Sequence, residues 1–439
     1  MHILFVHQSF PAQFGHIASH LVKREGFHCT FVSQLPKGNV DGVRLIHYKP
    51  KGGATKRVHY CSRPFENCTW NAHAVYTAME AHPEVKPDLI VGHSGFGSTV
   101  FLADLFDCPI INYFEYYYRS RSPAMESRSK RSAQEQDLLR ARMRNAMILC
   151  DLQTCAAGYS PTKWQRSLFP AEYQRKIQVI FDGIDRNVWY RRKVPRCIGQ
   201  CEIPAGTRIV TYVSRGFESI RGFDIFMKVA KRICDVRKDV IFVVVGSDRV
   251  CYGADLKHCK EKSFREHVLA QDRYDPSRFI FTGQILASQL AELLSLSDLH
   301  IYLTLPFVLS WSLMNSLAVG CTVLASDTEP VREVIQHERN GLLAGFHDVD
   351  ALAKQALRVL KAPDEFRPLG QAGVRLIDEK YSLAKTLPEM VNLYRRTMAG
   401  WKEKKRLIAQ SRSKQAEDEP AFVGKTGRSP LVSAFAAGG

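Results

Sequence analysis

The stretch HIYLTLPFVLSWSLMNSLAVGCTVLASD, residues His300–Asp327, decides the fold class of this chain. It opens with an apolar strand pattern and passes through a proline-containing loop. A helix follows that Ser310 can cap and that ends at Gly320, before a second apolar strand begins. Strand, helix and strand at these lengths are typical of a parallel βαβ unit. The sequence therefore predicts an α/β fold with parallel sheets.

The same alternation extends outward from this stretch in two blocks. In the first block we predict strands at His2–Val6, Cys29–Ser33, Val43–His47, Leu89–Gly92, Ile110–Phe114, Gln153–Ala156 and Ile177–Ile180, and helices near residues 12–24, 65–79, 98–106 and 131–147. In the second block we predict strands at Arg208–Val213, Val240–Gly246, Phe279–Phe281, His300–Leu303 and Val323–Ala325, and helices near residues 223–234, 288–296 and 310–319. Each block has the size of one doubly wound domain.

A polar stretch rich in Pro, Gly and basic residues separates the two blocks. We therefore expect an N-terminal Rossmann-like domain over residues 1–184, a linker over 185–207, a second Rossmann-like domain over 208–380, a helix over 381–405 and a disordered tail over 406–439. Two such domains face each other across a cleft. Ligands of open parallel sheets bind beyond the carboxyl ends of the strands, so the chemistry is expected there.

Composition narrows the class of protein. Of the 439 residues, 45% are apolar and 24% charged, which excludes a disordered, fibrous or small disulfide-rich chain. No apolar run is as long as a membrane span, and the N-terminal MHILFV lacks the basic region of a signal peptide. The twelve cysteines are scattered without zinc-ligand spacing. We expect a cytoplasmic protein with reduced thiols.

The net charge of +17 indicates an anionic partner. Part of the excess lies in Arg119–Arg144, which holds eight Lys or Arg residues against three acids. The chain has no zinc-finger, RNP or basic-zipper pattern, so nucleic acid is not the expected partner. A phosphorylated ligand and an anionic membrane surface remain, with a generic basic surface as the alternative.

Three strand-to-helix loops carry candidate phosphate-binding groups. Residues 7–15, HQSFPAQFG, lack the GxGxxG glycines but can direct helix amides near Gln13 and Gly15 at an anion. Residues 212–224, YVSRGFESIRGFD, place Arg215 and Arg221 around one loop, where two cations can hold a diphosphate. In the third loop the amides of Ser310, Trp311 and Ser312 are first-turn donors for a phosphate.

With these loops, the chain resembles a family 4 glycosyltransferase of the two-Rossmann-domain type called GT-B. Further matching segments are SPTKWQ at 160–165, VIFDGID at 179–185, FTG at 281–283, EPVREVI at 329–335 and NGLL at 340–343. Together they run from residue 1 to about residue 400 in the family's order.

The resemblance implies a retaining hexosyltransferase that uses a UDP- or GDP-sugar donor and no metal or other cofactor. The resemblance implies that Arg215 and Arg221 bind the donor diphosphate and that the backbone from Gly283 to Ile285 meets the nucleobase. It also implies that His93 contacts the donor sugar and that Glu115 contacts the acceptor or the sugar. The acceptor is expected to be a sugar or a lipid-linked or other glycan. A front-face path, with the leaving diphosphate helping to deprotonate the acceptor, fits this site.

One departure concerns two family glutamates eight residues apart, whose positions here hold Phe307 and Asn315. Phe307 cannot replace a carboxylate at the donor sugar. Asn315 can still contact the ribose, with nucleotide binding weakened by about 1 kcal/mol. The one Asp-x-Asp, at Asp348 and Asp350, is typical of a helix N-cap and not of a metal site.

Three alternatives remain open from the sequence. One is a GT-B epimerase or phosphorylase, although a phosphorylase needs a pyridoxal lysine and none is marked. The second is a catalytically degenerate GT-B protein that binds sugar nucleotides. The third is a basic nucleic-acid-binding protein, whose affinity would fall steeply with salt.

Overall fold

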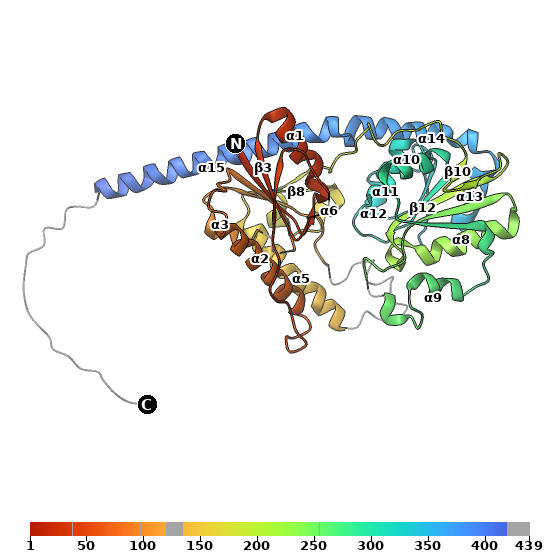
Figure 1. Ribbon diagram of the computed structural model, residues 1–439, viewed down its shortest axis with the longest axis horizontal. Helices are drawn as coiled ribbons and strands as arrows, with labels where there is room; N and C mark the ends of the chain where they lie inside the picture. Colours follow the sequence, from red (N-terminus) through yellow and green to blue (C-terminus); the bar gives the residue numbers. More distant parts are fainter. Residues whose placement is uncertain (37, 97–98, 120–134, 254, 419–439) are drawn as a thin grey trace, which may run out of the picture.

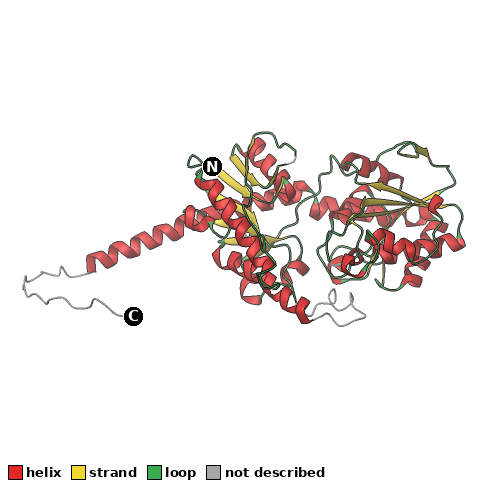
Figure 2. Cartoon of the chain, turned by 60° about the horizontal axis from the view of Figure 1, so that its bottom comes forward, coloured by secondary structure: helices red, strands yellow, loops and turns green. Residues whose placement is uncertain are grey.

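The computed structural model describes residues 1–36, 38–96, 99–119, 135–253 and 255–418. These residues form two α/β lobes that lie side by side, one built from the first half of the chain and one from the second (Figure 1). Each lobe contains a parallel sheet with helices on both faces, as the alternation of the sequence predicts (Figure 2).

The N-terminal sheet has seven parallel strands in the order β5-β3-β1-β6-β7-β8-β9. Their bounds are β1 His2–Val6, β3 His28–Ser33, β5 Val43–His47, β6 Leu89–His93, β7 Ile110–Tyr113, β8 Ala157–Ser160 and β9 Ile177–Val179; the pair β2 Ser9–Phe10 and β4 Leu35–Pro36 lies apart. The helical segments are η1 Ala12–Phe14, α1 Gly15–Glu25, α2 Arg63–Glu80, α3 Leu102–Leu105, α5 Glu135–Thr154, α6 Lys163–Ser167 and α7 Ala171–Gln174. Side chains alternate between two cores: Ile3 and Phe5 of β1 pack with α1, while Leu4 and Val6 pack with α2 and α5.

The C-terminal sheet has six parallel strands in the order β14-β13-β12-β15-β16-β17. Their bounds are β12 Arg208–Gly216, β13 Val240–Ser247, β14 Phe279–Gly283, β15 Leu299–Tyr302, β16 Val323–Ser326 and β17 Leu342–Ala344. The helical segments are η2 Ser219–Arg221, α8 Phe223–Val236, η3 Asp255–His258, α9 Phe264–Ala270, η4 Pro276–Arg278, α10 Ala287–Leu296, α11 Trp311–Val319, α12 Glu329–Arg332, α13 Val349–Lys361, α14 Pro363–Leu376 and η5 Ile377–Tyr381. In both lobes the carboxyl ends of the strands carry the loops that contain the candidate site residues.

The structure corrects several predicted elements. The strand predicted at Gln153–Ala156 is wrong, because α5 continues to Thr154 and the buried strand is β8. Leu152 and Cys155 pack in the core as helical and post-helical residues, so the apolar run reflects burial and not a strand. The strand β17 is not among the predicted elements, and the predicted linker contains a short antiparallel pair, β10 Cys197–Ile198 and β11 Cys201–Glu202.

The last helix, α15, is longer than predicted and belongs to the N-terminal lobe. It runs over Leu383–Asp418, so residues 406–418 are helical where the composition predicts a disordered tail. Met390, Tyr394 and Met398 of α15 are buried in the same core as β1 and α1. Figure 1 shows α15 running along the N-terminal lobe and continuing past it. The N-terminal core is therefore completed by a segment that follows the C-terminal lobe in the chain.

The chain crosses between the lobes twice, and the two crossings pair with each other. The amide of Ile184 donates to the carbonyl of Tyr381 at 2.8 Å, and the amide of Leu383 donates back to the carbonyl of Ile184 at 3.0 Å. Gly183 has φ +92°, and a Cβ there would collide with Thr386 and Leu383. Only glycine meets both the backbone conformation and the close approach.

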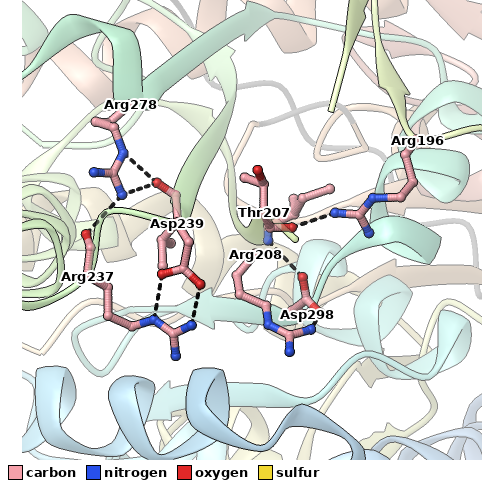
Figure 3. Close-up of polar contacts among 9 residues, drawn as sticks. Arg196, Thr207, Arg208, Arg237, Asp239, Arg278 and Asp298 are labelled. Atoms are coloured by element: carbon pink, nitrogen blue, oxygen red, sulfur yellow. Dashed lines mark hydrogen bonds and ion pairs between the residues drawn. The ribbon is translucent and has the colours of Figure 1, made fainter. Parts of the chain in front are cut away.

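A cluster of polar contacts holds together the amino-terminal ends of the strands of the C-terminal sheet (Figure 3). The Asp298 carboxylate accepts from the amide of Ile209 at 2.8 Å and from the Arg208 guanidinium at 3.3 Å. Arg278 donates to the carbonyls of Val240 and Arg237. These contacts lie at the opposite ends of the strands from the cleft, so they support the sheet and not the site.

Among the described residues, no helix combines the length and the apolar character that crossing a bilayer requires.

We expect Gly183→Ala to lower the free energy of unfolding by about 3 kcal/mol, since it adds steric collision to the strain of a positive φ. Gly199→Ala is the matched control, because Gly199 has φ +60° and open space around its Cβ position. That variant should lose only about 1 kcal/mol. Urea unfolding of both variants checks this, and equal losses would show that the crossing tolerates a side chain.

Candidate functional site

A cavity of about 300 Å³ lies between the two lobes at the carboxyl ends of the strands. From the N-terminal lobe and the first crossing it is lined by Tyr113, Glu115, Pro161, Phe181 and Asp182. From the C-terminal lobe it is lined by Tyr212, Val213, Ser214, Arg215, Arg221, Tyr252, Tyr302, Leu303, Val308, Leu309, Ser310, Trp311 and Ser312. Six of the predicted site residues thus meet around one cavity: Glu115, Arg215, Arg221, Ser310, Trp311 and Ser312.

Arg221 is a buried cation at the cavity wall, with 7% of its surface exposed. Its Nη1 donates to the hydroxyl of Thr304 at 3.0 Å and to the carbonyl of Val308 at 2.9 Å. These acceptors are neutral, and within the described residues no carboxylate comes within ion-pair distance of its guanidinium. The guanidinium also lies over the ring of Tyr252 at 5.6 Å. Because a guanidinium does not deprotonate in proteins, an anion entering the cavity would compensate this charge.

Glu218 is an acid near Arg221 whose carboxyl group binds backbone amides. Its carboxylate accepts from the amides of Cys251 at 2.5 Å and Tyr252 at 2.7 Å, which positions Tyr252 at the cavity. Burial raises the pKa of Glu218 to about 7. With a pKa near 7 this carboxyl is only partly ionised at neutral pH, and its Oε2 is occupied by the amides of Cys251 and Tyr252.

The N-terminus of α11 offers fewer free donors than the sequence suggests. The Ser310 amide donates to the Tyr302 hydroxyl at 3.0 Å, and the Ser312 amide donates to the Ser310 side chain at 3.2 Å. The prediction of three free amides is therefore wrong for two of them, because Ser310 acts as the N-cap and satisfies its own first turn. Ser310 and Ser312, whose hydroxyls lie 3.0 Å apart, still line the cavity.

Asp182 is the main group at the cavity that the sequence analysis misses. It follows β9 at the first crossing and accepts from the Trp311 indole at 2.8 Å and the Tyr113 hydroxyl at 3.5 Å. Burial raises the pKa of Asp182 to about 7, with the neighbouring Glu115 charge adding to the rise. A signal was present in the sequence, since the segment VIFDGID has Asp where the family pattern has Asn.

His93 and Glu115 approach each other where β6 and β7 end. Their Nε2 and Oε2 atoms are 3.7 Å apart, and Nδ1 of His93 donates to the Ser94 carbonyl at 2.8 Å. Behind them, the ring of His7 lies 5.3 Å from that of His93. Burial and the neighbouring His93 lower the pKa of His7 to about 3, so His7 is neutral at physiological pH.

Asp151 of α5 holds the loop that follows His93. Its buried carboxylate accepts from the Gly95 amide at 3.0 Å and from the Thr99 hydroxyl at 3.3 Å. Burial raises the pKa of Asp151 to about 6. A lone acid inside the apolar run MILCDLQT is the sequence signal that could have identified it.

Six predicted site residues do not line the cavity. Asn315 is buried inside α11, one turn beyond the half-exposed Trp311. Gly283 ends β14 and Ile285 follows it, while Gln13 lies in η1 and Gly15 begins α1. His93 stands one step behind the cavity, in contact with Glu115. Their assigned contacts with a nucleotide or a phosphate stay predictions.

Phe307 packs in an aromatic cluster that joins the lobes. Its ring centroid lies 5.0 Å from that of Tyr116 and 5.2 Å from that of Tyr252. The guanidinium of Arg221 lies 5.2 Å from the Phe307 ring. The position therefore contributes packing and a cation–π contact where the family pattern has a carboxylate.

Polar contacts join the two lobes beside the cavity. The Glu333 carboxylate, from the C-terminal lobe, accepts from the amides of Lys163 at 2.7 Å and Trp164 at 2.8 Å and so caps α6 of the N-terminal lobe. Gln165 donates to the Glu115 carbonyl at 2.7 Å and accepts from the Leu309 amide at 3.4 Å. The segments SPTKWQ and EPVREVI are thus an inter-lobe contact.

Two remaining sequence predictions concern metal and charge. Asp348 caps α13 by accepting from the Ala351 amide at 2.9 Å, as its position before a helix predicts. Among the described residues, no group of three or more His, Cys, Asp or Glu side chains could hold a metal ion. Of the basic stretch Arg119–Arg144, residues 120–134 lie outside the described residues, and Arg140, Arg142 and Arg144 lie on α5.

Two parallel-sheet α/β lobes around one cleft define the GT-B class of protein, which confirms the predicted fold. The chain belongs to the family 4, group 1 glycosyltransferases. Residues 25–188 match the model described as glycosyl transferase family 4 group, and residues 198–375 match the one described as glycosyl transferases group 1.

Curated relatives and solved structures agree with this assignment. N-acetyl-alpha-D-glucosaminyl L-malate synthase of Bacillus anthracis is 23% identical over 220 residues, 50% of this chain and 54% of the relative. Alpha-maltose-1-phosphate synthase of Mycolicibacterium smegmatis is 25% identical over 242 residues, 53% of this chain and 59% of the relative. The alignments thus span somewhat more than half the length of these relatives.

Two solved structures share the fold over most of both chains. The sucrose-phosphate synthase of Thermosynechococcus elongatus superposes with a TM-score of 0.69 at 19% identity, covering 91% of this chain and 100% of the other. HepE of Anabaena, solved in complex with UDP-glucose, superposes with a TM-score of 0.65 at 14% identity, covering 90% and 99%.

The raised pKa of Asp182 predicts a pH-dependent stability. Because the folded protein binds this proton up to about pH 7 and the unfolded chain only to about pH 4, stability falls as pH rises through that window. Asp182→Asn removes the dependence and keeps an acceptor for Trp311. We expect the variant to gain about 1–3 kcal/mol over the parent protein on going from pH 5 to pH 8.

Urea unfolding of both proteins at the two pH values measures this difference. Asp104→Asn, on the exposed surface of α3, is the control and should show the same difference at both pH values. A stability difference for Asp182→Asn that does not change with pH would contradict an elevated pKa.

Proposed function

We propose that this glycosyltransferase is a retaining, metal-independent hexosyltransferase that uses a nucleotide-diphospho-sugar donor. The observation that carries the proposal is the buried Arg221 at the cavity wall, whose protein acceptors are all neutral. A diphosphate held by Arg221, Arg215 and the α11 hydroxyls would compensate this charge. The complexes of HepE with UDP and with UDP-glucose support the class of donor.

The cavity has two chemically different sides, which suits transfer from a diphosphate. Arg215 and Arg221 lie on the C-terminal side, and Glu115 and Asp182 lie on the side of the N-terminal lobe and the crossing. As the bond to the leaving diphosphate breaks, the arginines stabilise its growing negative charge. The carboxyls lie where sugar hydroxyls and an oxocarbenium-like centre can be contacted.

The acceptor proton has a route that needs no further residue. In a front-face path the leaving phosphate oxygen takes the proton of the incoming acceptor hydroxyl, on the same face of the sugar. Attack on that face gives retention. The acceptor, a sugar or a lipid-linked or other glycan, and the cytoplasmic location expected from the sequence are part of this proposal.

A catalytically degenerate sugar-nucleotide-binding protein is the second candidate. The observation that favours it is Phe307, which packs against Tyr116 and Tyr252 and supplies no carboxylate to the sugar. Product formation from a panel of UDP- and GDP-sugars with glycan acceptors separates the candidates. Binding of donor without transfer or hydrolysis of any panel member would favour the second.

We expect Arg215→Ala to weaken UDP or GDP binding about 10- to 100-fold, because it removes a charged donor from the exposed side of the cavity. Arg221→Lys, which keeps a charge but loses the planar fork, should weaken binding about tenfold. Isothermal titration calorimetry measures both. Arg249→Ala is the control, since Arg249 is an exposed arginine after β13 that does not line the cavity. Unchanged affinity in both site variants would reject the diphosphate assignment.

We expect turnover to stay within about twofold in excess chelator, because the arginines supply the charge that a metal would otherwise supply. A coupled assay for released nucleotide with and without chelator tests this. Loss of turnover that added Mg²⁺ or Mn²⁺ restores would show that a metal takes part.

A further inference from the structure

The loop between β5 and α2 carries a dense positive charge. Residues 48–62, which we call the basic loop, join these two elements, and between Asp41 and Glu66 the chain holds six Lys or Arg residues and no acid. Four cations of the basic loop have exposed side chains: Lys49, Lys51, Lys56 and Arg57. Among the described residues, none of these four side chains forms a hydrogen bond or an ion pair. Their charge is therefore available to a partner.

Other groups fix the basic loop, so its exposed cations are not needed to hold its conformation. Arg63, at the start of α2, donates to the backbone carbonyls of Lys56 and Val58, both at 3.0 Å. The Ala54 amide donates to the side chain of Asn67 on α2 at 2.8 Å. The four exposed cations thus extend from a backbone that α2 holds in place.

The basic loop is linked through α2 to the loop that follows His93. The strands β5 and β6 are parallel in one sheet, so both loops leave the sheet at the edge that faces the cleft. On α2, Cys68 donates to the Gly95 carbonyl and Asn71 donates to the Phe96 carbonyl, each at 3.1 Å. The ring of Phe96 lies 4.6 Å from the ring of His93. One helix therefore positions both loops, and an acceptor longer than a single sugar can contact the two.

We propose that the basic loop binds the acidic part of an anionic glycan acceptor, an oligosaccharide whose sugars carry carboxylate or phosphate groups. This inference rests on the proposed function, because it takes the N-terminal side of the cleft as the acceptor side. The hydroxyl that receives the sugar lies near Glu115 in the cavity, while acidic groups further along the same acceptor contact the four exposed cations. Each such contact is a charge-assisted hydrogen bond or an ion pair, so the loop selects acceptors by their charge.

Two other anionic partners fit this surface less well. Insertion into a bilayer needs apolar side chains beside the cations, and among the described residues no large apolar side chain between Leu45 and Leu139 is exposed. Single-stranded nucleic acid is bound on aromatic side chains, and the basic loop has no exposed Phe, Tyr or Trp. A sugar chain needs neither feature, because its acidic groups and hydroxyls bind through ion pairs and hydrogen bonds.

Calorimetric titration of the full chain with an oligogalacturonate of about eight sugars tests the proposal, with its methyl ester as the uncharged probe. Titrations at about 50 mM and 300 mM salt measure the electrostatic part of the affinity. The loop variant combines Lys56→Ala with Arg57→Ala. The matched control combines Arg24→Ala with Lys86→Ala, two exposed cations without a partner among the described residues. These two lie at the other end of the same lobe, in the last turn of α1 and before β6.

We expect the parent chain to bind the oligogalacturonate, more weakly at high salt, and not to bind the methyl ester. The loop variant should bind about tenfold more weakly at low salt, with an unchanged melting temperature, because two of the four exposed cations are lost. The control variant loses the same charge and should stay within about twofold of the parent chain.

No binding by the parent chain, or equal losses in the two variants, would overturn the proposal, even where the chain transfers sugar to a neutral acceptor. Tighter, loop-dependent binding of a thymidylate oligonucleotide of equal charge would overturn it in favour of nucleic acid. Loop-dependent binding to phosphatidylglycerol vesicles without binding of the glycan would overturn it in favour of lipid headgroups. Because no donor is present in the titration, loop-dependent binding supports this surface even if the chain transfers no sugar, a result that would contradict the proposed function alone.

Discussion

The paired crossings of the chain are the constraint on which the rest of the structure depends. Backbone hydrogen bonds join Ile184 of the first crossing to Tyr381 and Leu383 of the return crossing. Gly183 allows the two crossing segments to approach each other. Beyond the return crossing, α15 buries Tyr394 in the N-terminal core. The N-terminal lobe is therefore incomplete without α15, which follows the C-terminal lobe in the chain.

This constraint also places the chemistry. On the first crossing Ile180 is buried in the N-terminal core and Phe181 in the C-terminal core, and the next residue, Asp182, lines the cavity between the lobes. There the Trp311 indole, at the start of α11, donates to its carboxylate across the lobes. The first crossing thus positions Asp182 on the carboxyl side of the cavity, while the end of β12 and the loop after it position the arginines on the cationic side. A movement of the lobes would change the distance between the two sides.

The fold was predictable because it depends on short-range pattern. Apolar strands and capped helices such as Ser310–Gly320 repeat along the chain, and each unit is visible by itself. Two groups of features were not predictable. Asp182 and Trp311 meet only through the crossing, 129 residues apart; the departure from the family pattern marks Asp182 itself but not its contact with Trp311. The Ser312 amide was assigned to a ligand, although the N-cap hydroxyl two residues earlier satisfies it. The predicted strand at Gln153–Ala156 was wrong because an apolar run can be buried in a helix as well as in a strand. The apolar residues of the last turn of α5 face the core from a helix.

Phe307 stands where the family pattern has a glutamate, and the cavity keeps its positive charge without that carboxylate. The guanidinium of Arg221 lies 5.2 Å from the Phe307 ring, so a carboxylate at this position would come within reach of Arg221 and compensate its charge inside the protein. With phenylalanine there, the aromatic faces of Phe307 and Tyr252 reduce the cost of burying the cation but do not neutralise it. The positive charge therefore remains available to a ligand. Carboxyl groups are still present at the cavity, since Glu115 and Asp182 line it from the other side. The substitution thus separates the two signs of charge across the cleft, with the cations on one lobe and the acids on the other and at the hinge. A donor with an anionic leaving group and a hydroxyl-bearing sugar matches that polarity in one orientation only.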